Sequence, residues 1–157
     1  MRADRIEREI RIDAPIDVVW AVVTEPEHIA TWFSDEAEID VRPGGDGRLV
    51  WQMKATNRAM AVNLRVERLE PPHAFSFRWN YPDDAEPMAS NAALVEFALE
   101  ADGESTRLRL VESGLEALES TDAEKNAYFD EHSRGWDKHL GGLREYAVAQ
   151  RSVAANR

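Results

Sequence analysis

Residues 75–81 read Phe-Ser-Phe-Arg-Trp-Asn-Tyr, with an aromatic residue at every second position. Because side chains alternate between the two faces of a β-strand, these aromatic rings share one face. Residues 124–150 predict a long helix with one apolar face, because apolar residues recur there at helical spacing. That face is formed by Phe129, Trp136, Leu140, Leu143 and Ala147. An aromatic sheet face and an apolar helix face each need a partner, so we expect the helix to lie across the sheet.

The remaining sequence predicts further strands and two short helices. Alternating apolar residues indicate strands at 6–12, 38–42, 48–54, 61–69, 94–100 and 106–112. The short helices are predicted at 15–23 and 27–32, separated by Pro26, which restricts the preceding residue to extended geometry. Consecutive strands joined by short turns imply an antiparallel sheet. We therefore predict an α+β fold with a curved antiparallel sheet of about six to seven strands, two short N-terminal helices and one long C-terminal helix packed across the sheet.

The length of 157 residues suits one domain, which we place at 1–150, followed by a flexible C-terminal tail at 151–157. The N-terminal residues contain no apolar segment of the kind found in signal peptides, and no apolar run is long enough for a membrane helix. These features predict a cytoplasmic protein without membrane insertion.

The net charge of -11 argues against nucleic acid as a partner, because a nucleic-acid-binding surface needs an excess of basic residues. The absence of cysteine excludes disulfides, thiolate metal ligands and cysteine nucleophiles. The same negative charge also argues against anionic membrane surfaces as partners.

Four segments, in the expected order, resemble one superfamily of known proteins. They are residues 14–33 (from Ala-Pro-Ile-Asp-Val-Val-Trp to Trp-Phe), 66–79, 106–115 and 135–143. The chain resembles the START-like helix-grip superfamily, also called SRPBCC or polyketide-cyclase-like. Within it, the chain is similar to the bacterial proteins named after the activator of the heat-shock-protein-90 ATPase. Leu115 departs from the family pattern, which usually has an aromatic residue there.

The resemblance implies the helix-grip (START-like) fold, in which the long helix typically stands away from a curved sheet. It does not fix the chemistry, because relatives range from ligand carriers to cyclases and co-chaperones. The departure at residue 115 is expected to affect the mouth of any pocket.

Large aromatic residues are the first candidates for a binding site. They either line a cavity between the sheet and the helix or fill the core with nothing else bound. Met53 suits both arrangements, because methionine is a flexible side chain that fills irregular gaps. The candidate aromatic residues are Trp32, Trp51, Phe77, Trp79 and Trp136.

His132 is the first polar candidate. It follows Phe129 by three residues and precedes Trp136 by four, so it lies on or beside the apolar helix face. A histidine there either hydrogen-bonds a ligand or acts as a general base, or it is a structural residue with its polar atoms satisfied.

Glu112 is the second polar candidate, because it shares the inward parity of the last strand. A buried carboxylate needs a partner, and Arg8 and Arg68 have inward parity on their own strands. A polar floor under a ligand is one interpretation. An edge residue that reaches water is the other.

Gly135, Gly141 and Gly142 lie within the predicted long helix, and each should cost about 1 kcal/mol relative to alanine. Either the helix bends there to admit a ligand, or the backbone approaches the sheet and Trp136 closely. We expect the close approach.

Motifs for metal binding, nucleophilic catalysis and phosphate binding are missing. His132 and His139 are two helical turns apart, and neither His-Glu-x-x-His nor Gly-x-Ser-x-Gly occurs. The glycine-rich residues 44–47 lack the lysine of a phosphate loop and predict a turn. We therefore assign no metal ligand, no cofactor and no catalytic residue.

We predict a protein that binds a small hydrophobic or amphipathic molecule, such as a lipid, between the sheet and the C-terminal helix. The predicted ligand-binding residues are Trp32, Trp51, Met53, Phe77, Trp79, Glu112, Phe129, His132 and Trp136. The first alternative is a polyketide-cyclase or aromatase-type enzyme using the same cavity, which the single candidate base disfavours. The second is a co-chaperone-like stress or interaction module, which the family name suggests. A homodimer that forms through an exposed strand edge is a further alternative.

Overall fold

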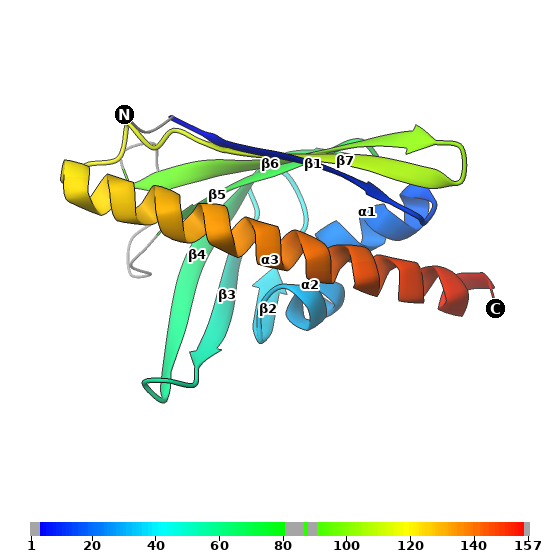
Figure 1. Cartoon of the computed structure of the whole chain (residues 1–157), viewed down its shortest axis with the longest axis horizontal. Coiled ribbons are helices and arrows are strands. Elements are labelled where there is room, and N and C mark those ends of the chain that lie inside the picture. The colour runs from blue at the N-terminus through cyan, green and yellow to red at the C-terminus, as the bar shows by residue number, and fades with distance from the viewer. Residues whose placement is uncertain (1–3, 81–86, 88–90, 156–157) are drawn as a thin grey trace.

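A computed structural model of the chain describes residues 4–80, 87 and 91–155. Within them, seven strands form one antiparallel sheet, and a long helix crosses it with two short helices beside its C-terminal half (Figure 1). The strands are β1 (Ile6–Ile12), β2 (Glu36–Ile39), β3 (Asp46–Met53), β4 (Arg58–Glu70), β5 (Ala74–Asn80), β6 (Ala92–Asp102) and β7 (Ser105–Ser113). The helices are α1 (Ile16–Thr24), α2 (Pro26–Trp32) and α3 (Asp122–Ala155). The predicted α+β helix-grip fold is confirmed.

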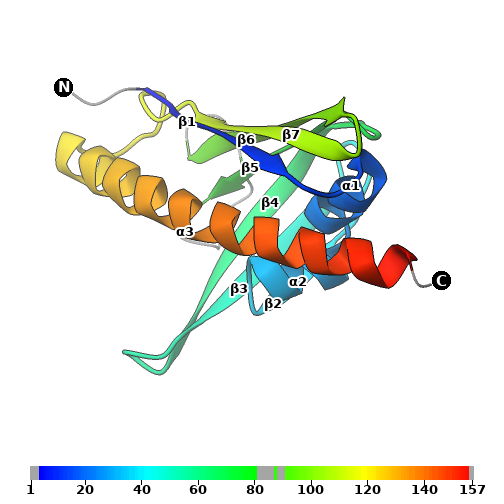
Figure 2. The same ribbon diagram turned by 45° about the vertical axis from the view of Figure 1, so that its right-hand side comes forward.

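The strand order is β1-β7-β6-β5-β4-β3-β2, so β1 closes one edge of the sheet and β2 the other. Helix α3 packs against β1 at the first edge. The β3–β4 hairpin extends away from α3, which is visible in both views (Figures 1 and 2). The sheet and the helix therefore diverge on the side of β3, β4 and β5.

The aromatic strand behaves as its alternation predicts. Phe75, Phe77 and Trp79 are buried against the core, while Tyr81 lies outside the described residues. On the facing helix, Trp136, Leu140, Leu143 and Ala147 are also buried. Each fully buried leucine contributes roughly 1.5–3 kcal/mol through removal of apolar surface from water, so these two faces hold the helix to the sheet.

A capping box starts α3 two residues earlier than the predicted Glu124. The Thr121 hydroxyl accepts the backbone N–H of Glu124 at 3.1 Å, and the Glu124 carboxylate accepts the backbone N–H of Thr121 at 3.1 Å. This reciprocal pair satisfies two backbone donors that a helix start leaves unpaired. Hydrogen bonds from the backbone N–H and from the hydroxyl of Thr121 to the Glu124 carboxylate lower the pKa of Glu124.

The C-terminal end of α3 also differs from the prediction. Residues 151–155, predicted as part of a flexible tail, continue the helix to Ala155. Arg151 donates to the backbone carbonyl of Asp13 at 3.1 Å and so connects this last stretch to the segment between β1 and α1. None of the described helices combines the length and apolarity needed to cross a membrane.

A tight turn explains why β2 ends at Ile39 and not at the predicted residue 42. The backbone N–H of Asp40 bonds the carbonyl of Asp46 at 3.0 Å, which closes the turn between β2 and β3. A Cβ at Gly45 would lie 1.9 Å from the carbonyl oxygen of Asp40, so only glycine fits that position.

Candidate functional site

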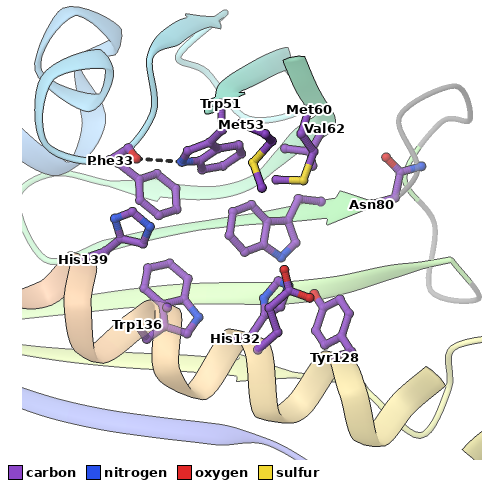
Figure 3. Close-up of a pocket in the computed structure, with 13 residues that line it drawn as sticks. Phe33, Trp51, Met53, Met60, Val62, Asn80, Tyr128, His132, Trp136 and His139 are labelled. Atoms are coloured by element: carbon purple, nitrogen blue, oxygen red, sulfur yellow. Dashed lines mark hydrogen bonds between the residues drawn. The ribbon is translucent and has the colours of Figure 1, made fainter. Parts of the chain in front are cut away.

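A pocket opens where the sheet diverges from α3 (Figure 3). It has a volume of about 160 Å³, and aromatic and apolar side chains form most of its wall. Strands β3, β4 and β5 supply one side, helix α3 supplies the other, and Phe33 after α2 closes one end. The lining residues are Phe33, Trp51, Met53, Met60, Val62, Trp79, Asn80, Tyr128, Glu131, His132, Gly135, Trp136 and His139. The interior is therefore not filled completely by the protein's own side chains.

The structure brings part of the predicted site together at this pocket. The predicted residues on its wall are Trp51, Met53, Trp79, His132 and Trp136. Whether they contact a ligand stays a prediction.

The other aromatic candidates do not line the pocket. Trp32 is buried and donates its indole N–H to the carbonyl of Val22 at 2.8 Å. Phe77 lies in the core, and Phe129 packs half-buried against it. Trp32 stacks on Phe33 and Phe77 meets Trp79 edge-on, so these two residues support the wall from behind.

Sequence reasoning missed eight lining residues: Phe33, Met60, Val62, Asn80, Tyr128, Glu131, Gly135 and His139. The helical ones had a detectable signal. Tyr128, Gly135 and His139 stand four residues before, three after and seven after His132, so they share its stripe on α3. That stripe borders the apolar face of α3, so a prediction based on the apolar face alone does not include its residues.

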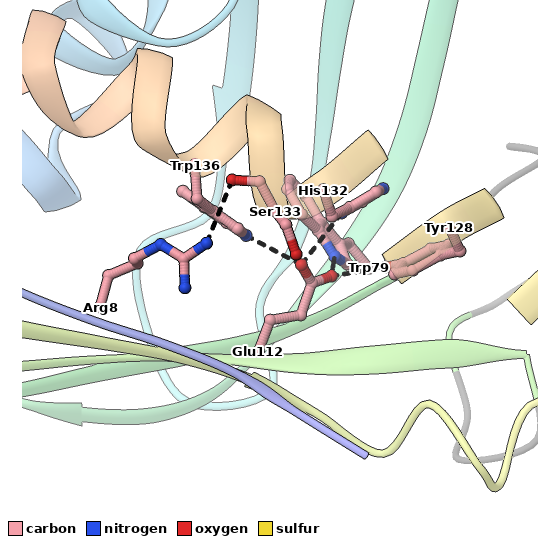
Figure 4. A network of polar contacts seen from close by, with 7 residues as sticks. All are labelled: Arg8, Trp79, Glu112, Tyr128, His132, Ser133 and Trp136. Carbon is pink, nitrogen blue, oxygen red and sulfur yellow. Dashed lines mark hydrogen bonds and ion pairs between the residues drawn. The ribbon is translucent and has the colours of Figure 1, made fainter. Parts of the chain in front are cut away.

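Glu112 lies beneath the pocket and is completely buried (Figure 4). One carboxylate oxygen accepts the indole N–H of Trp79 at 2.8 Å and the hydroxyl of Tyr128 at 2.5 Å. The other oxygen accepts the indole N–H of Trp136 at 2.8 Å and bonds Nδ1 of His132 at 2.9 Å. The carboxylate thus joins β7, β5 and three turns of α3, with two hydrogen-bond partners at each oxygen.

Two opposing effects act on the pKa of Glu112. Burial is the largest and raises it, but attraction to His132 and hydrogen bonds from His132, Tyr128 and Trp136 together hold the pKa below its ordinary value. Four donors surround the two oxygens, and a hydrogen-bonded carboxylate favours its charged form. Burial, followed by the nearby charge of Glu112, raises the pKa of Tyr128, so its hydroxyl stays protonated.

The arginine partners predicted for Glu112 are wrong. Arg8 has the expected inward parity, but it binds the carboxylate of Asp137 at 2.7 Å. It also donates to the backbone carbonyl of Ser133 (Figure 4). Arg68 is exposed and pairs with Glu70, because the register between β4 and β5 shifts between Val66 and Arg68. Such an irregularity changes the face on which the following side chains lie.

His132 is held between the buried carboxylate and the pocket. Its ring stacks on Tyr128 with centroids 3.8 Å apart and meets the indole of Trp79 edge-on. Its side chain is 15% exposed. The Glu112 carboxylate bonds one ring nitrogen, and the pocket lies on the other side of the ring. This arrangement orients a histidine for hydrogen bonding or proton transfer.

His139 lies one turn beyond Trp136 and is half-buried. Its ring meets Phe33 edge-on at 4.8 Å. Burial, together with the charge of Lys138, lowers the pKa of His139 despite a hydrogen bond to the backbone of Trp32. His139 is therefore an uncharged member of the pocket wall at neutral pH.

The close approach expected at the helical glycines is wrong. A Cβ at Gly135 or Gly141 would meet nothing within 4 Å, and at Gly142 it would lie 3.8 Å from the backbone oxygen of Trp32. The neighbour of Gly142 is thus α2 and not the sheet. Gly135 opens onto the pocket, where its missing side chain adds to the free space.

No three His, Asp or Glu side chains gather in a geometry suited to a metal ion within residues 4–80, 87 and 91–155.

Comparison with known proteins gives one family match. The family described as Activator of Hsp90 ATPase homolog 1-like protein matches residues 13–147. No curated protein matches the chain by sequence.

Several solved structures share the fold. DynU16, a protein of the dynemicin biosynthetic locus, has a TM-score of 0.72 and 21% identity over 96% of this chain. The chain spans about half of DynU16, 49% of its length. Protein NE0264 from Nitrosomonas europaea has a TM-score of 0.77 and 16% identity, covering 97% of this chain and 99% of its own. CalU16 from Micromonospora echinospora has a TM-score of 0.65 and 25% identity, covering 91% of this chain and 75% of its own.

Proposed function

The chain belongs to the Activator of Hsp90 ATPase homolog 1-like family, and we propose that it binds a small hydrophobic or amphipathic molecule in the pocket between the sheet and α3. The main support is the pocket itself, a space of about 160 Å³ walled by Trp51, Trp79, Trp136 and Phe33. Concave, mostly apolar pockets with a few polar groups are typical of small-molecule sites. The place of the similar protein DynU16 in a biosynthetic locus agrees with a small-molecule ligand.

The size of the pocket sets the scale of the affinity. A bicyclic aromatic molecule that buries about 200 Å² of apolar surface gains roughly 5 kcal/mol at 25 cal/mol per Å². Loss of translational and rotational freedom reduces this gain. Apolar burial alone therefore gives weak binding, and polar contacts must supply the remaining affinity and the selectivity.

A titration with N-phenyl-1-naphthylamine tests the proposal, because this uncharged probe fluoresces strongly only in apolar surroundings. We expect saturable binding of one molecule per chain, together with a change in tryptophan fluorescence from the pocket wall. A linear, non-saturating response would contradict a defined pocket. Native mass spectrometry of freshly purified protein provides a second readout, in which a retained small molecule adds its mass.

One observation favours a second candidate function, an enzyme that uses His132 as a general base. Glu112 and His132 form an inward pair within hydrogen-bond reach, at 2.9 Å. A carboxylate that orients a histidine is a recurring way to prepare a base. The donors of Trp79 and Trp136 are already bonded to Glu112, so they do not provide an oxyanion site. Proton abstraction therefore suits the pocket better than acyl transfer.

The compound 5-nitrobenzisoxazole tests this second function, because its ring opening requires only a base in an apolar pocket. The base removes the proton on C3, the electron pair forms the nitrile, and the N–O bond breaks to release a coloured phenolate. Turnover above the buffer rate that disappears in His132→Phe would support the base. Equal rates with and without protein would remove this candidate.

A co-chaperone-like or stress-related interaction module has less support. Among the described residues, the exposed large apolar side chains are Met53 on β3 and Val148 on α3, which lie on separate elements. Partner-binding surfaces usually present a contiguous apolar patch. A cytoplasmic location and a homodimer through an edge strand stay predictions, and light scattering during size-exclusion chromatography tests the dimer.

A further inference from the structure

The hydrogen-bond donors of the aromatic pocket wall all bond acceptors of the protein itself. The indole N–H groups of Trp79 and Trp136 and the hydroxyl of Tyr128 all bond Glu112. The indole N–H of Trp51 bonds the carbonyl of Phe33 at 2.8 Å. A ligand in the pocket therefore meets the faces and edges of these rings and not their polar hydrogens.

His132, in contrast, presents a hydrogen-bond acceptor to the pocket. Glu112 already receives the donors of Trp79, Tyr128 and Trp136, and an ionised carboxylate can only accept. Nδ1 of His132, 2.9 Å from Glu112, must then carry the hydrogen of that contact. In the neutral ring the lone pair is left on Nε2, which lies on the side of the imidazole away from Glu112 (Figure 4). No hydrogen bond to Nε2 comes from the described part of the chain.

The other polar groups of the wall also disfavour a negatively charged ligand. Glu131 adds a carboxylate at the rim, and His139 is uncharged, with a hydrogen bond to the backbone of Trp32. Asn80 is the one amide side chain among the lining residues and already makes an interaction of its own. Neither lysine nor arginine occurs among the thirteen described residues that line the pocket. An anionic ligand would thus face a carboxylate without a compensating cation.

We propose that the pocket selects uncharged apolar molecules whose polar end donates a hydrogen bond, as an alcohol, phenol or N–H group does, and that Nε2 of His132 is the acceptor. This inference rests on the proposed binding function and adds the chemical class of the ligand. Carboxylate and phosphate amphiphiles are excluded by the same geometry. Glu112 acts through His132 as a positioning residue, since it fixes which ring nitrogen faces the pocket.

Three probes of similar size separate the alternatives at pH 8. They are 2-naphthol, which donates a hydrogen bond, 2-methoxynaphthalene, which only accepts, and the anion 2-naphthoate. Calorimetric titration should give a Kd for 2-naphthol at least roughly tenfold below those of the other two, as expected for one good polar contact in a desolvated site.

Replacing His132 by phenylalanine removes the acceptor and keeps a ring of similar size. The preference for 2-naphthol over 2-methoxynaphthalene, measured as the ratio of the two Kd values, should disappear in His132→Phe. His73→Phe is the matched control, because His73 bonds the carbonyl of Leu99 away from the pocket. This control should keep the full preference.

Nitrogen-15 NMR of the histidine rings provides a readout that does not need a ligand. Wild-type protein at pH 8 should show His132 protonated on Nδ1 and unprotonated on Nε2. Glu112→Gln should disturb that pattern, because the amide no longer requires a donor at Nδ1. A ring protonated on Nε2, alone or on both nitrogens, would overturn the inference.

The outcomes also separate this inference from the proposed function. Equal binding of 2-naphthol and 2-methoxynaphthalene, or tighter binding of 2-naphthoate, overturns the donor preference and leaves a binding pocket. Failure of all three probes to bind, together with failure of N-phenyl-1-naphthylamine, overturns both the pocket's function and its selectivity.

Discussion

Trp79 and Trp136 stack with their ring centroids 5.7 Å apart, and each donates its indole N–H to a different oxygen of Glu112. One tryptophan comes from the sheet and the other from α3. Their flat faces form part of the pocket wall, while their polar edges reach the buried carboxylate. The same contact therefore holds the helix to the sheet and keeps polar hydrogens out of the pocket.

Glu112→Gln should lower the free energy of unfolding by roughly 2–4 kcal/mol, because the amide nitrogen would face buried donors that need an acceptor. Urea denaturation followed by tryptophan fluorescence measures this change. Glu100→Gln is the control, since Glu100 is exposed on β6 and should change stability by no more than about 0.5 kcal/mol. Equal effects of the two substitutions would show that the buried network adds no stability.

The stability contributed by Glu112 should depend on pH with a defined sign. Its folded pKa is lowered, so ionisation stabilises the folded state. This contribution is fully present above the unfolded glutamate pKa of about 4.3 and is lost as the pH falls through the folded value. The stability difference between wild type and Glu112→Gln should accordingly shrink as the pH falls below about 5. A difference that grows on acidification would require a raised pKa.

Thr121→Ala removes one half of the capping box that starts α3. The backbone N–H of Glu124 loses its acceptor, and unfolding free energy should fall by about 1 kcal/mol. Ser120→Ala is a nearby control with an exposed side chain outside the helix. Unchanged stability in Thr121→Ala, measured by thermal denaturation, would mean that the helix start frays without cost.

Helical glycines should tolerate alanine. Gly135→Ala and Gly141→Ala each place a methyl group in open space, and each should raise the unfolding free energy by up to about 1 kcal/mol through helix propensity. Chemical denaturation tests both. A destabilised Gly135→Ala would show that the pocket wall closes over this position.

Much of the fold could be predicted from residue spacing, because alternation on strands and helical periodicity both reflect burial. The aromatic strand at 75–80 and the apolar face of α3 lie where their patterns place them. The spacing of apolar residues did not predict where α3 begins and ends. The capping box at Thr121 sets one end, and the other continues past Gln150.

The site was only partly predictable, since its polar contacts depend on tertiary structure. Parity placed Glu112 inward, but the partners came from indole and phenol groups and not from arginine. The register shift before Arg68 has no clear sequence signature, and it turns that side chain outward. Tyr128 could have been found from its position four residues before His132.

The most direct measurement compares pocket filling at two matched glycines. Gly135 lines the pocket and Gly141 does not, although both lie in α3 with open space at the Cβ position. Gly135→Leu should weaken binding of N-phenyl-1-naphthylamine at least roughly tenfold, which corresponds to about 1.4 kcal/mol. Gly141→Leu should leave the wild-type Kd unchanged. If both variants bind the probe as the wild type does, the pocket beneath α3 is not where this protein holds its ligand.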